Sequence, residues 1–299
     1  MRIVIIGHTG FIGNNIYQNL INNKENEILG ISTNEIDLTK DKSAKTLSEI
    51  LTPDCVVIMC AGIKKQLGDN LETFESNLNI VINFSKAISV IQPKKIIFFS
   101  SASVYGEDVA YPEMITEKTV VQPKTYYGIG KYAAEILLKK TCGENSIQLV
   151  IIRPPLVYGK DDLSRGYGPT GFTFKAIYDE EIILWGDGSE FREFVYVGDV
   201  GKIVSRLVNS NYNGILNIVS GTSHSYKEIL DVLKKIMDLN IKVEYRTRTK
   251  EKVDHHYSND LIHDALGNFE FTNLKDGLAQ THCAIINTLK GINEDRQRS

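Results

Sequence analysis

The sequence predicts an α/β protein built on a doubly wound parallel sheet, with a smaller C-terminal lobe. Short apolar runs alternate with longer segments whose apolar residues recur at helical spacing. A glycine-rich turn follows the first of these runs directly. Continuous apolar strands separated by helices are typical of parallel sheets that helices cover on both faces, and right-handed crossovers make such sheets doubly wound.

Five apolar runs are the strand candidates of this sheet, at residues 2–6, 28–31, 55–59, 96–99 and 149–152. Between the second and third runs, Leu47, Ile50 and Leu51 predict a helix that ends before Pro53. Before the fifth run, a helix is expected to end near Gly143, because glycine is common at helix C-termini.

The bulk composition is that of an ordinary globular protein. Hydrophobic residues make up 42% of the 299 positions and charged residues 24%. A net charge of −3 gives no reason to expect binding to nucleic acid or to anionic membranes. No apolar run approaches the ~20 residues that span a bilayer. The four cysteines form no CxxC pair, which favours reduced thiols in a cytoplasmic protein.

The glycine-rich turn predicts a dinucleotide site. Its first glycines let the chain turn tightly and approach a pyrophosphate, and its last lets the following helix pack closely on the sheet. The helix N-terminus then offers free N–H groups to the phosphates. A tight strand-to-helix turn without a ligand is the alternative. The residues expected to bind the cofactor here are Gly7, Thr9, Gly10, Phe11, Ile12 and Gly13.

The choice between NAD and NADP stays open. A dinucleotide site usually has an acid at the end of the second strand, where it binds the ribose 2′-hydroxyl. Here Ser32 follows the second predicted strand, and neither a carboxylate nor an arginine stands directly at that position. Asp37 and Leu38 follow slightly later and are expected near the adenosine. Asp37 is alternatively a solvated acid or a helix cap.

Tyr127 and Lys131 are the candidates for proton transfer. Four residues apart on a helix, their side chains share one face. An ammonium nearby, together with an oxidised nicotinamide, is expected to lower the pKa of the phenol from its usual value near 10. Ser101 and Ser103 follow the fourth strand at the sheet edge where ligands bind, so a hydroxyl there can hydrogen-bond the reacting oxygen. A serine cap of the next turn is the alternative.

The order of these motifs resembles the extended short-chain dehydrogenase/reductase family of nucleotide-sugar epimerases, dehydratases and reductases. The resemblance extends from residue 2 to about residue 280 and implies a Rossmann fold, NAD or NADP as cofactor, a nucleotide-sugar substrate and a homodimer. It implies Ser101, Tyr127 and Lys131 as catalytic residues. It adds five residues to the cofactor site, which are Ala61, Gly62, Lys64, Asn77 and Pro154.

The resemblance also divides the chain. Residues 1–157 are the expected Rossmann domain, to which residues 191–220 return, and residues 158–190 and 221–299 form the smaller substrate-binding lobe. Ser103 and Arg192 are expected to bind the substrate, Arg192 through a phosphate. A surface ion pair of Arg192 with Glu190 or Glu193 is the alternative.

Departures from the family pattern narrow the expected chemistry. The 4,6-dehydratases carry an Asp-Glu pair where this chain has Ala102 and Ser103, so dehydration is not expected. The segment 159–181 lacks the histidine with which GDP-fucose synthases epimerise their substrate. We therefore expect a 4-keto-6-deoxy-sugar reductase. The alternatives are a 4-epimerase with tightly bound NAD, which Lys64 favours, and a non-catalytic NAD(P)-binding regulator.

No metal site is expected. The spacing of His255, His256 and His263 with Asp254 fits no standard zinc pattern. Arg246 and Arg248 follow a predicted strand, and the sequence leaves open whether they hold a diphosphate or face solvent.

Overall fold

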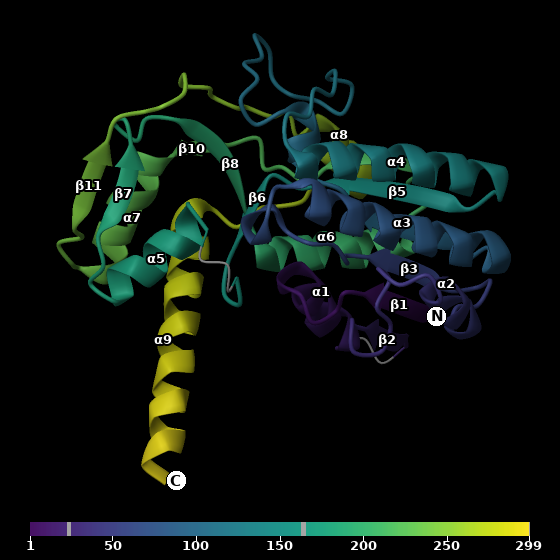
Figure 1. Ribbon diagram of the computed structural model, residues 1–299. Helices are drawn as coiled ribbons and strands as arrows, with labels where there is room; N and C mark the ends of the chain where they lie inside the picture. Colours follow the sequence, from purple (N-terminus) through teal and green to yellow (C-terminus); the bar gives the residue numbers. More distant parts are fainter. Residues whose placement is uncertain (23–24, 163–165, 299) are drawn as a thin grey trace.

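The computed structural model describes residues 1–22, 25–162 and 166–298, with side chains up to residue 290, so position 299 of the predicted lobe lies outside the described residues. Within these residues, the central sheet has six parallel strands in the order β2-β1-β3-β4-β5-β9 (Figure 1). The strands are β1 (Arg2–Ile6), β2 (Glu27–Ile31), β3 (Val56–Met59), β4 (Lys95–Phe99), β5 (Gln148–Arg153) and β9 (Gly214–Asn217).

Helices cover both faces of this sheet, as the doubly wound fold requires. The helices α2 (Ser43–Ile50), α3 (Leu71–Ile91) and α4 (Tyr126–Glu144) cover one face, and α1 (Phe11–Ile21) and α6 (Val197–Asn209) the other. Alternate residues of one strand enter the two cores: Val4 packs toward α3 and α4, whereas Ile3 packs toward α1 and α6. The predicted fold class is therefore confirmed.

Two local features differ from the sequence analysis. The sequence analysis did not predict β9, whose four residues include Gly214 and Asn217 and carry a weak strand signal. Helix α4 ends near Gly143, as predicted, at Glu144, but its C-cap is Asn145 and not the glycine; the Asn145 side chain donates to Thr141 O (2.8 Å). The left-handed turn after the helix falls on Ser146, with φ of 55°.

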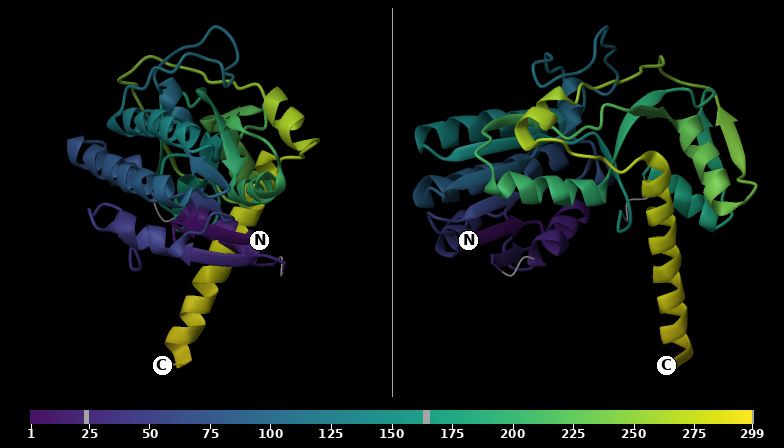
Figure 2. Two further views of the ribbon diagram at one scale, coloured as in Figure 1. Left: turned by 90° about the vertical axis from the view of Figure 1, so that its right-hand side faces the viewer. Right: turned by 180° about the vertical axis from the view of Figure 1, so that it is seen from behind.

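Beyond the central sheet, the described residues form two short sheets. One sheet joins β6 (Leu156–Tyr158), β8 (Phe191–Tyr196) and β10 (Ser223–Ser225); the other pairs β7 (Ile182–Trp185) with β11 (Val243–Arg246). Around them lie α5 (Pro169–Ile177), α7 (Tyr226–Met237) and α9 (Leu274–Arg298), whose C-terminal end projects away from the rest of the chain (Figure 2). Helix α8 (Asp260–Leu266) instead packs against the core beneath α6. The domain boundaries stay a prediction.

A buried polar network ties the ends of three strands of the central sheet to α4. Glu135 of α4 accepts hydrogen bonds from Ser100 Oγ (2.5 Å) and from Arg153 Nε and Nη2 (2.9 and 2.6 Å). Arg153 also donates to Tyr105 Oη (2.9 Å), which donates to Asn217 Oδ1 (2.8 Å). All five side chains are almost fully buried. The network therefore fixes α4 relative to the ends of β4, β5 and β9.

None of the helices in the described part of the chain is long and apolar enough to cross a membrane.

Replacing Arg153 with Met is expected to lower the free energy of unfolding by about 3–5 kcal/mol, because it leaves the Glu135 carboxylate buried and unpaired. Urea denaturation at neutral pH measures the effect. The matched double variant Arg153→Met/Glu135→Leu removes both charges and should recover part of the loss. A single variant as stable as the wild type would contradict this account of the network.

Candidate active site

The glycine turn between β1 and α1 fits a pyrophosphate. Gly7 has φ of +88°, and a Cβ there would lie 2.8 Å from the backbone nitrogen of Ala61. A Cβ at Gly13 would lie 2.2 Å from the carbonyl oxygen of Gly7. Gly10 caps α1 without a side-chain hydrogen bond, so the first N–H groups of the helix remain available to an anion. The turn thus needs its glycines and presents donors to phosphate.

A cavity of about 250 Å³ extends from this turn to the end of β4. Most of the predicted cofactor residues line it together with the predicted catalytic set. The predicted residues that line it are Gly7, Gly10, Phe11, Ile12, Gly13, Gly62, Lys64, Ser101, Ser103, Tyr127, Lys131 and Pro154. The structure therefore brings predicted residues from five segments of the sequence to one cavity.

Six predicted cofactor residues lie outside this cavity: Thr9, Ser32, Asp37, Leu38, Ala61 and Asn77. Asn77 holds the segment after β3, since its amide accepts from Ile63 N (2.8 Å) and donates to Ile63 O (3.1 Å). Asp37 caps a turn, accepting from the backbone and hydroxyl of Thr39 (3.0 and 2.7 Å). These hydrogen bonds lower the pKa of the Asp37 carboxyl.

The structure reveals a carboxylate that the sequence analysis missed. Glu35 folds back to the end of β2, where its Oε2 accepts hydrogen bonds from the backbone N (2.7 Å) and hydroxyl (2.5 Å) of Ser32. These hydrogen bonds lower the pKa of Glu35. The end of β2 therefore does carry an acid, contrary to the expectation. The Ser-x-x-Glu spacing was the available signal, because a Glu three residues on can reach back to such an N–H.

The predicted catalytic residues lie together where β4 ends. Lys131 Nζ donates to Phe99 O (2.7 Å) and lies 5.8 Å from the centroid of the Tyr127 ring. Ser101 lines the same cavity as Tyr127. Thr125 caps the N-terminus of α4, accepting from Gly128 N (3.0 Å), and so sets the point at which the helix presents Tyr127.

The electrostatics of this group differ from the expectation. Burial raises the pKa of Tyr127 to about 12, although the hydrogen bond with Ser101 lowers it and the charge of Glu107 raises it further. Burial also lowers the pKa of Lys131 to about 8. The predicted lowering of the Tyr127 pKa by Lys131 is therefore wrong for the protein alone, because loss of solvation is the largest influence on the phenol.

A second cavity, of about 670 Å³, meets the first at the serine turn after β4. Ser101, Ser103 and Glu107 line both cavities. The far walls of the second cavity come from the smaller lobe and from the loop after β11. They include Tyr167, Trp185, Arg192, Glu193, Tyr226, His255 and Tyr257.

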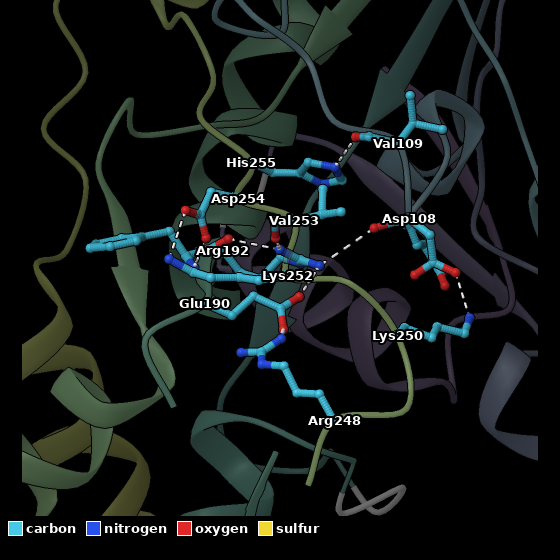
Figure 3. Close-up of polar contacts among 12 residues, drawn as sticks. Asp108, Val109, Glu190, Arg192, Arg248, Lys250, Lys252, Val253, Asp254 and His255 are labelled. Carbon is cyan, nitrogen blue, oxygen red and sulfur yellow. Dashed lines mark hydrogen bonds and ion pairs between the residues drawn. The ribbon is translucent and has the colours of Figure 1, made fainter. Parts of the chain in front are cut away.

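Arg192 lines this second cavity, but it is already paired (Figure 3). Its guanidinium forms an ion pair with Glu190 and hydrogen-bonds the carbonyl oxygens of Phe191 (2.9 Å) and Val253. The ion pair named as the alternative is thus present in the structure. Glu190 also pairs with Arg248, so two arginines share one carboxylate and the three side chains keep a net positive charge.

Neighbouring charged groups take other roles. Arg246 pairs with Glu244 on the surface (2.8 Å), which is the solvent-facing outcome of the alternatives left open. Glu193 is buried and accepts hydrogen bonds from the backbone and hydroxyl of Ser220 (both 2.6 Å), and burial raises its pKa to about 7. Among the described residues, no group of three or more His, Cys, Asp or Glu side chains could hold a metal ion.

The depressed pKa of Lys131 predicts a pH-dependent stability. Between about pH 8 and the usual lysine pKa of about 10.5, the unfolded chain binds more protons at this position than the folded chain. The free energy of unfolding of the wild type, measured relative to Lys131→Met, should therefore rise with pH across that window. Urea titrations at pH 7.5 and 10 measure the difference. The exposed Lys139→Met variant is the control, and an equal response of both variants would contradict the burial argument.

Comparisons with known proteins agree with this geometry. Residues 3–219 match the profile of the NAD dependent epimerase/dehydratase family. A Methanocaldococcus jannaschii protein assigned as a UDP-glucose 4-epimerase is 28% identical over 310 residues, covering 97% of this chain and 99% of that protein. The GDP-6-deoxy-D-talose 4-dehydrogenase of Aggregatibacter actinomycetemcomitans is 26% identical over 241 residues, covering 79% of this chain and 80% of that protein.

The fold is similar to that of solved sugar-nucleotide enzymes. The UDP-glucose 4-epimerase of Thermotoga maritima, solved with UDP-glucose, has a TM-score of 0.86 and 23% identity, covering 97% of this chain and all of that chain. The family profile matches more than two thirds of the sequence and contains the glycine turn, Ser101, Tyr127 and Lys131. The chain therefore belongs to the NAD-dependent epimerase/dehydratase family, and it is an enzyme that uses NAD or NADP.

Proposed function

We propose that the protein transfers a hydride at C4 of a nucleotide-diphosphate sugar, as a reductase of 4-keto-6-deoxy sugars. One observation carries the proposal: Ser101, Tyr127 and Lys131 lie together at the cavity that starts from the glycine turn, and Ser101 also lines the second cavity. A dinucleotide and a second, larger ligand can therefore meet at one phenol.

The protonation of Tyr127 favours the direction of reduction. In this direction a bound NADH or NADPH would supply the hydride. With a pKa of about 12, Tyr127 keeps its proton at neutral pH and can donate it to the oxygen that becomes the alcohol. Ser101 can hydrogen-bond the same oxygen and stabilise its charge. Lys131 donates a hydrogen bond to Phe99 O, which holds its ammonium group next to the Tyr127 ring.

The second cavity suits a nucleotide diphosphate. Its Arg192 is the donor for a phosphate, which would take the place that the Glu190 carboxylate occupies. The Tyr167 and Trp185 rings line the same cavity and are each about 40% exposed, so they leave flat apolar surface for a nucleobase.

We also propose a homodimer through α3 and α4, because Ile82, Ile129 and Ile136 are exposed on these helices.

A 4-epimerase with tightly bound NAD is the second candidate. The M. jannaschii relative, which this chain matches along nearly its whole length, is assigned that activity. Lys64, which resembles a lysine of the UDP-galactose 4-epimerases, lines the first cavity, where it pairs with Asp162 (3.3 Å). The non-catalytic alternative has lost its support, since the chain retains all three catalytic residues at one point.

For the cofactor, we propose a preference for NAD over NADP. The Glu35 carboxylate at the end of β2 would accept a hydrogen bond from a ribose 2′-hydroxyl and would repel a 2′-phosphate.

The reductase should oxidise NADH or NADPH stoichiometrically with a 4-keto-6-deoxy nucleotide sugar, followed as loss of absorbance at about 340 nm. Tyr127→Phe should lower kcat by about 10²–10⁴-fold, because the proton donor is lost. Tyr126→Phe, at the exposed neighbouring phenol, is the control and should keep its activity. Interconversion of C4 epimers without added cofactor would select the 4-epimerase instead.

Glu35→Ser should shift the ratio of kcat/KM for NADPH over NADH upward by about tenfold, since it removes a negative charge from the ribose site. Steady-state kinetics with both cofactors measure the ratio. Asp37→Asn is the matched control and should leave the ratio unchanged, because Asp37 binds Thr39. A larger shift in the Asp37 variant than in the Glu35 variant would assign the ribose to Asp37.

A further inference from the structure

A chain of hydroxyl groups leads from the Tyr127 phenol to a carboxylate at the surface. Ser101 and Tyr127 line the same cavity, and the Ser101 side chain is near enough to lower the Tyr127 pKa. Ser101 Oγ donates to Ser103 Oγ (3.1 Å), and Ser103 Oγ donates to Glu107 Oε1 (2.9 Å). The side chain of Glu107 is 35% exposed and pairs with Lys65, which is exposed to the same extent. The chain thus connects the proposed proton donor with solvent through two hydroxyls.

The backbone holds this chain in place. Ser101 precedes the 3-10 helix η2 (Ala102–Tyr105), and its Oγ also accepts from Ser103 N (3.1 Å). Gly106 has φ of +94°, and a Cβ there would lie 2.5 Å from Gln122 O, so the chain turns tightly before Glu107. Tyr105 beneath is fixed by the buried network of Glu135 and Arg153. The spacing of the hydroxyls therefore does not depend on a mobile loop.

Reduction of a ketone needs such a path. Each turnover consumes one proton in addition to the hydride, and Tyr127, which faces the cavity that the dinucleotide would fill, must recover that proton from water before it can act again. Epimerisation consumes no net proton, so a path to solvent is specific to the reductase. We propose that Glu107 is the outer end of a proton relay that recharges Tyr127 through Ser103 and Ser101; this rests on the function proposed above.

The protons balance along the relay. Tyr127 gives its hydroxyl proton to the substrate oxygen and is left as a phenolate. Glu107, a carboxylate paired with Lys65 at rest, takes a proton from water, which is left as hydroxide. It passes this proton to Ser103, Ser103 passes one to Ser101, and Ser101 passes one to Tyr127. Glu107 is then a carboxylate again, and the three hydroxyls are restored. Glu107 never touches the substrate and acts only through the serines.

The principal test removes the Glu107 carboxylate and then supplies formate in its place. Glu107→Ala should lower kcat for reduction about tenfold, with little change in KM, because recovery of the proton becomes slow. Added formate should restore the rate in a saturable manner by entering the space of the lost carboxyl. Ser103→Ala should show the same loss, but formate should not restore it, because the break lies inside the relay.

Glu144→Ala is the control. It removes an exposed carboxylate that pairs with Lys140 at the surface (2.7 Å) and lines neither cavity, and it should keep the wild-type rate. A Glu107→Ala enzyme that works at the wild-type rate, or whose loss formate does not repair, would overturn the relay while the proposed function stands.

A second readout does not require turnover. The absorbance titration of Tyr127, taken as the difference between each protein and its Tyr127→Phe counterpart, should shift to lower pH in Glu107→Ala, since the charge of Glu107 raises the Tyr127 pKa. An unshifted titration would contradict the coupling. A wild-type protein that reduces no 4-keto sugar would overturn the proposed function, and the titration would then decide whether Glu107 is coupled to Tyr127.

Discussion

The buried ion pair between Glu135 and Arg153 is the constraint on which the site depends. A carboxylate and a guanidinium that are buried away from water are tolerated only where they are well hydrogen-bonded. Here Ser100 donates a further hydrogen bond to Glu135, and Tyr105 accepts one from Arg153. Three residues of this network stand next to residues proposed to bind the cofactor or to catalyse the reaction. Ser100 precedes Ser101, Arg153 precedes Pro154, and Glu135 lies one helical turn after Lys131. Satisfying the buried charges therefore positions the groups that line the two cavities.

Burial also decides how protons are distributed in the site. It raises the pKa of Tyr127 and lowers that of Lys131, so the phenol keeps its proton more firmly and the ammonium holds its own less firmly than in water. A tyrosine in this state is a proton donor that has to be resupplied. Ser101 and Ser103 connect it to the partly exposed Glu107, and this connection can resupply the proton without any change in the backbone.

Features with a local signal could be predicted from the sequence. The five long strands, the glycine turn and the Tyr127–Lys131 helix depend on periodicity or short spacing, and the structure contains them. Features set by packing and by the path of the loops could not, because residue spacing alone does not show them. Examples are the buried pairing of Arg153 with Glu135, which are 18 residues apart, and the turn at Gly106 that brings Glu107 to Ser103. The sign of the Tyr127 pKa shift likewise depends on burial, which spacing does not reveal.

A crystal structure with NAD and a nucleotide-diphosphate 4-keto sugar bound together tests the central claim most directly. The account predicts the Tyr127 hydroxyl within about 2.6–3.2 Å of the C4 oxygen of the sugar, with the pyrophosphate of the dinucleotide on the turn from Gly7 to Gly13. A sugar whose C4 oxygen faces away from Tyr127, or a dinucleotide bound elsewhere, would contradict it.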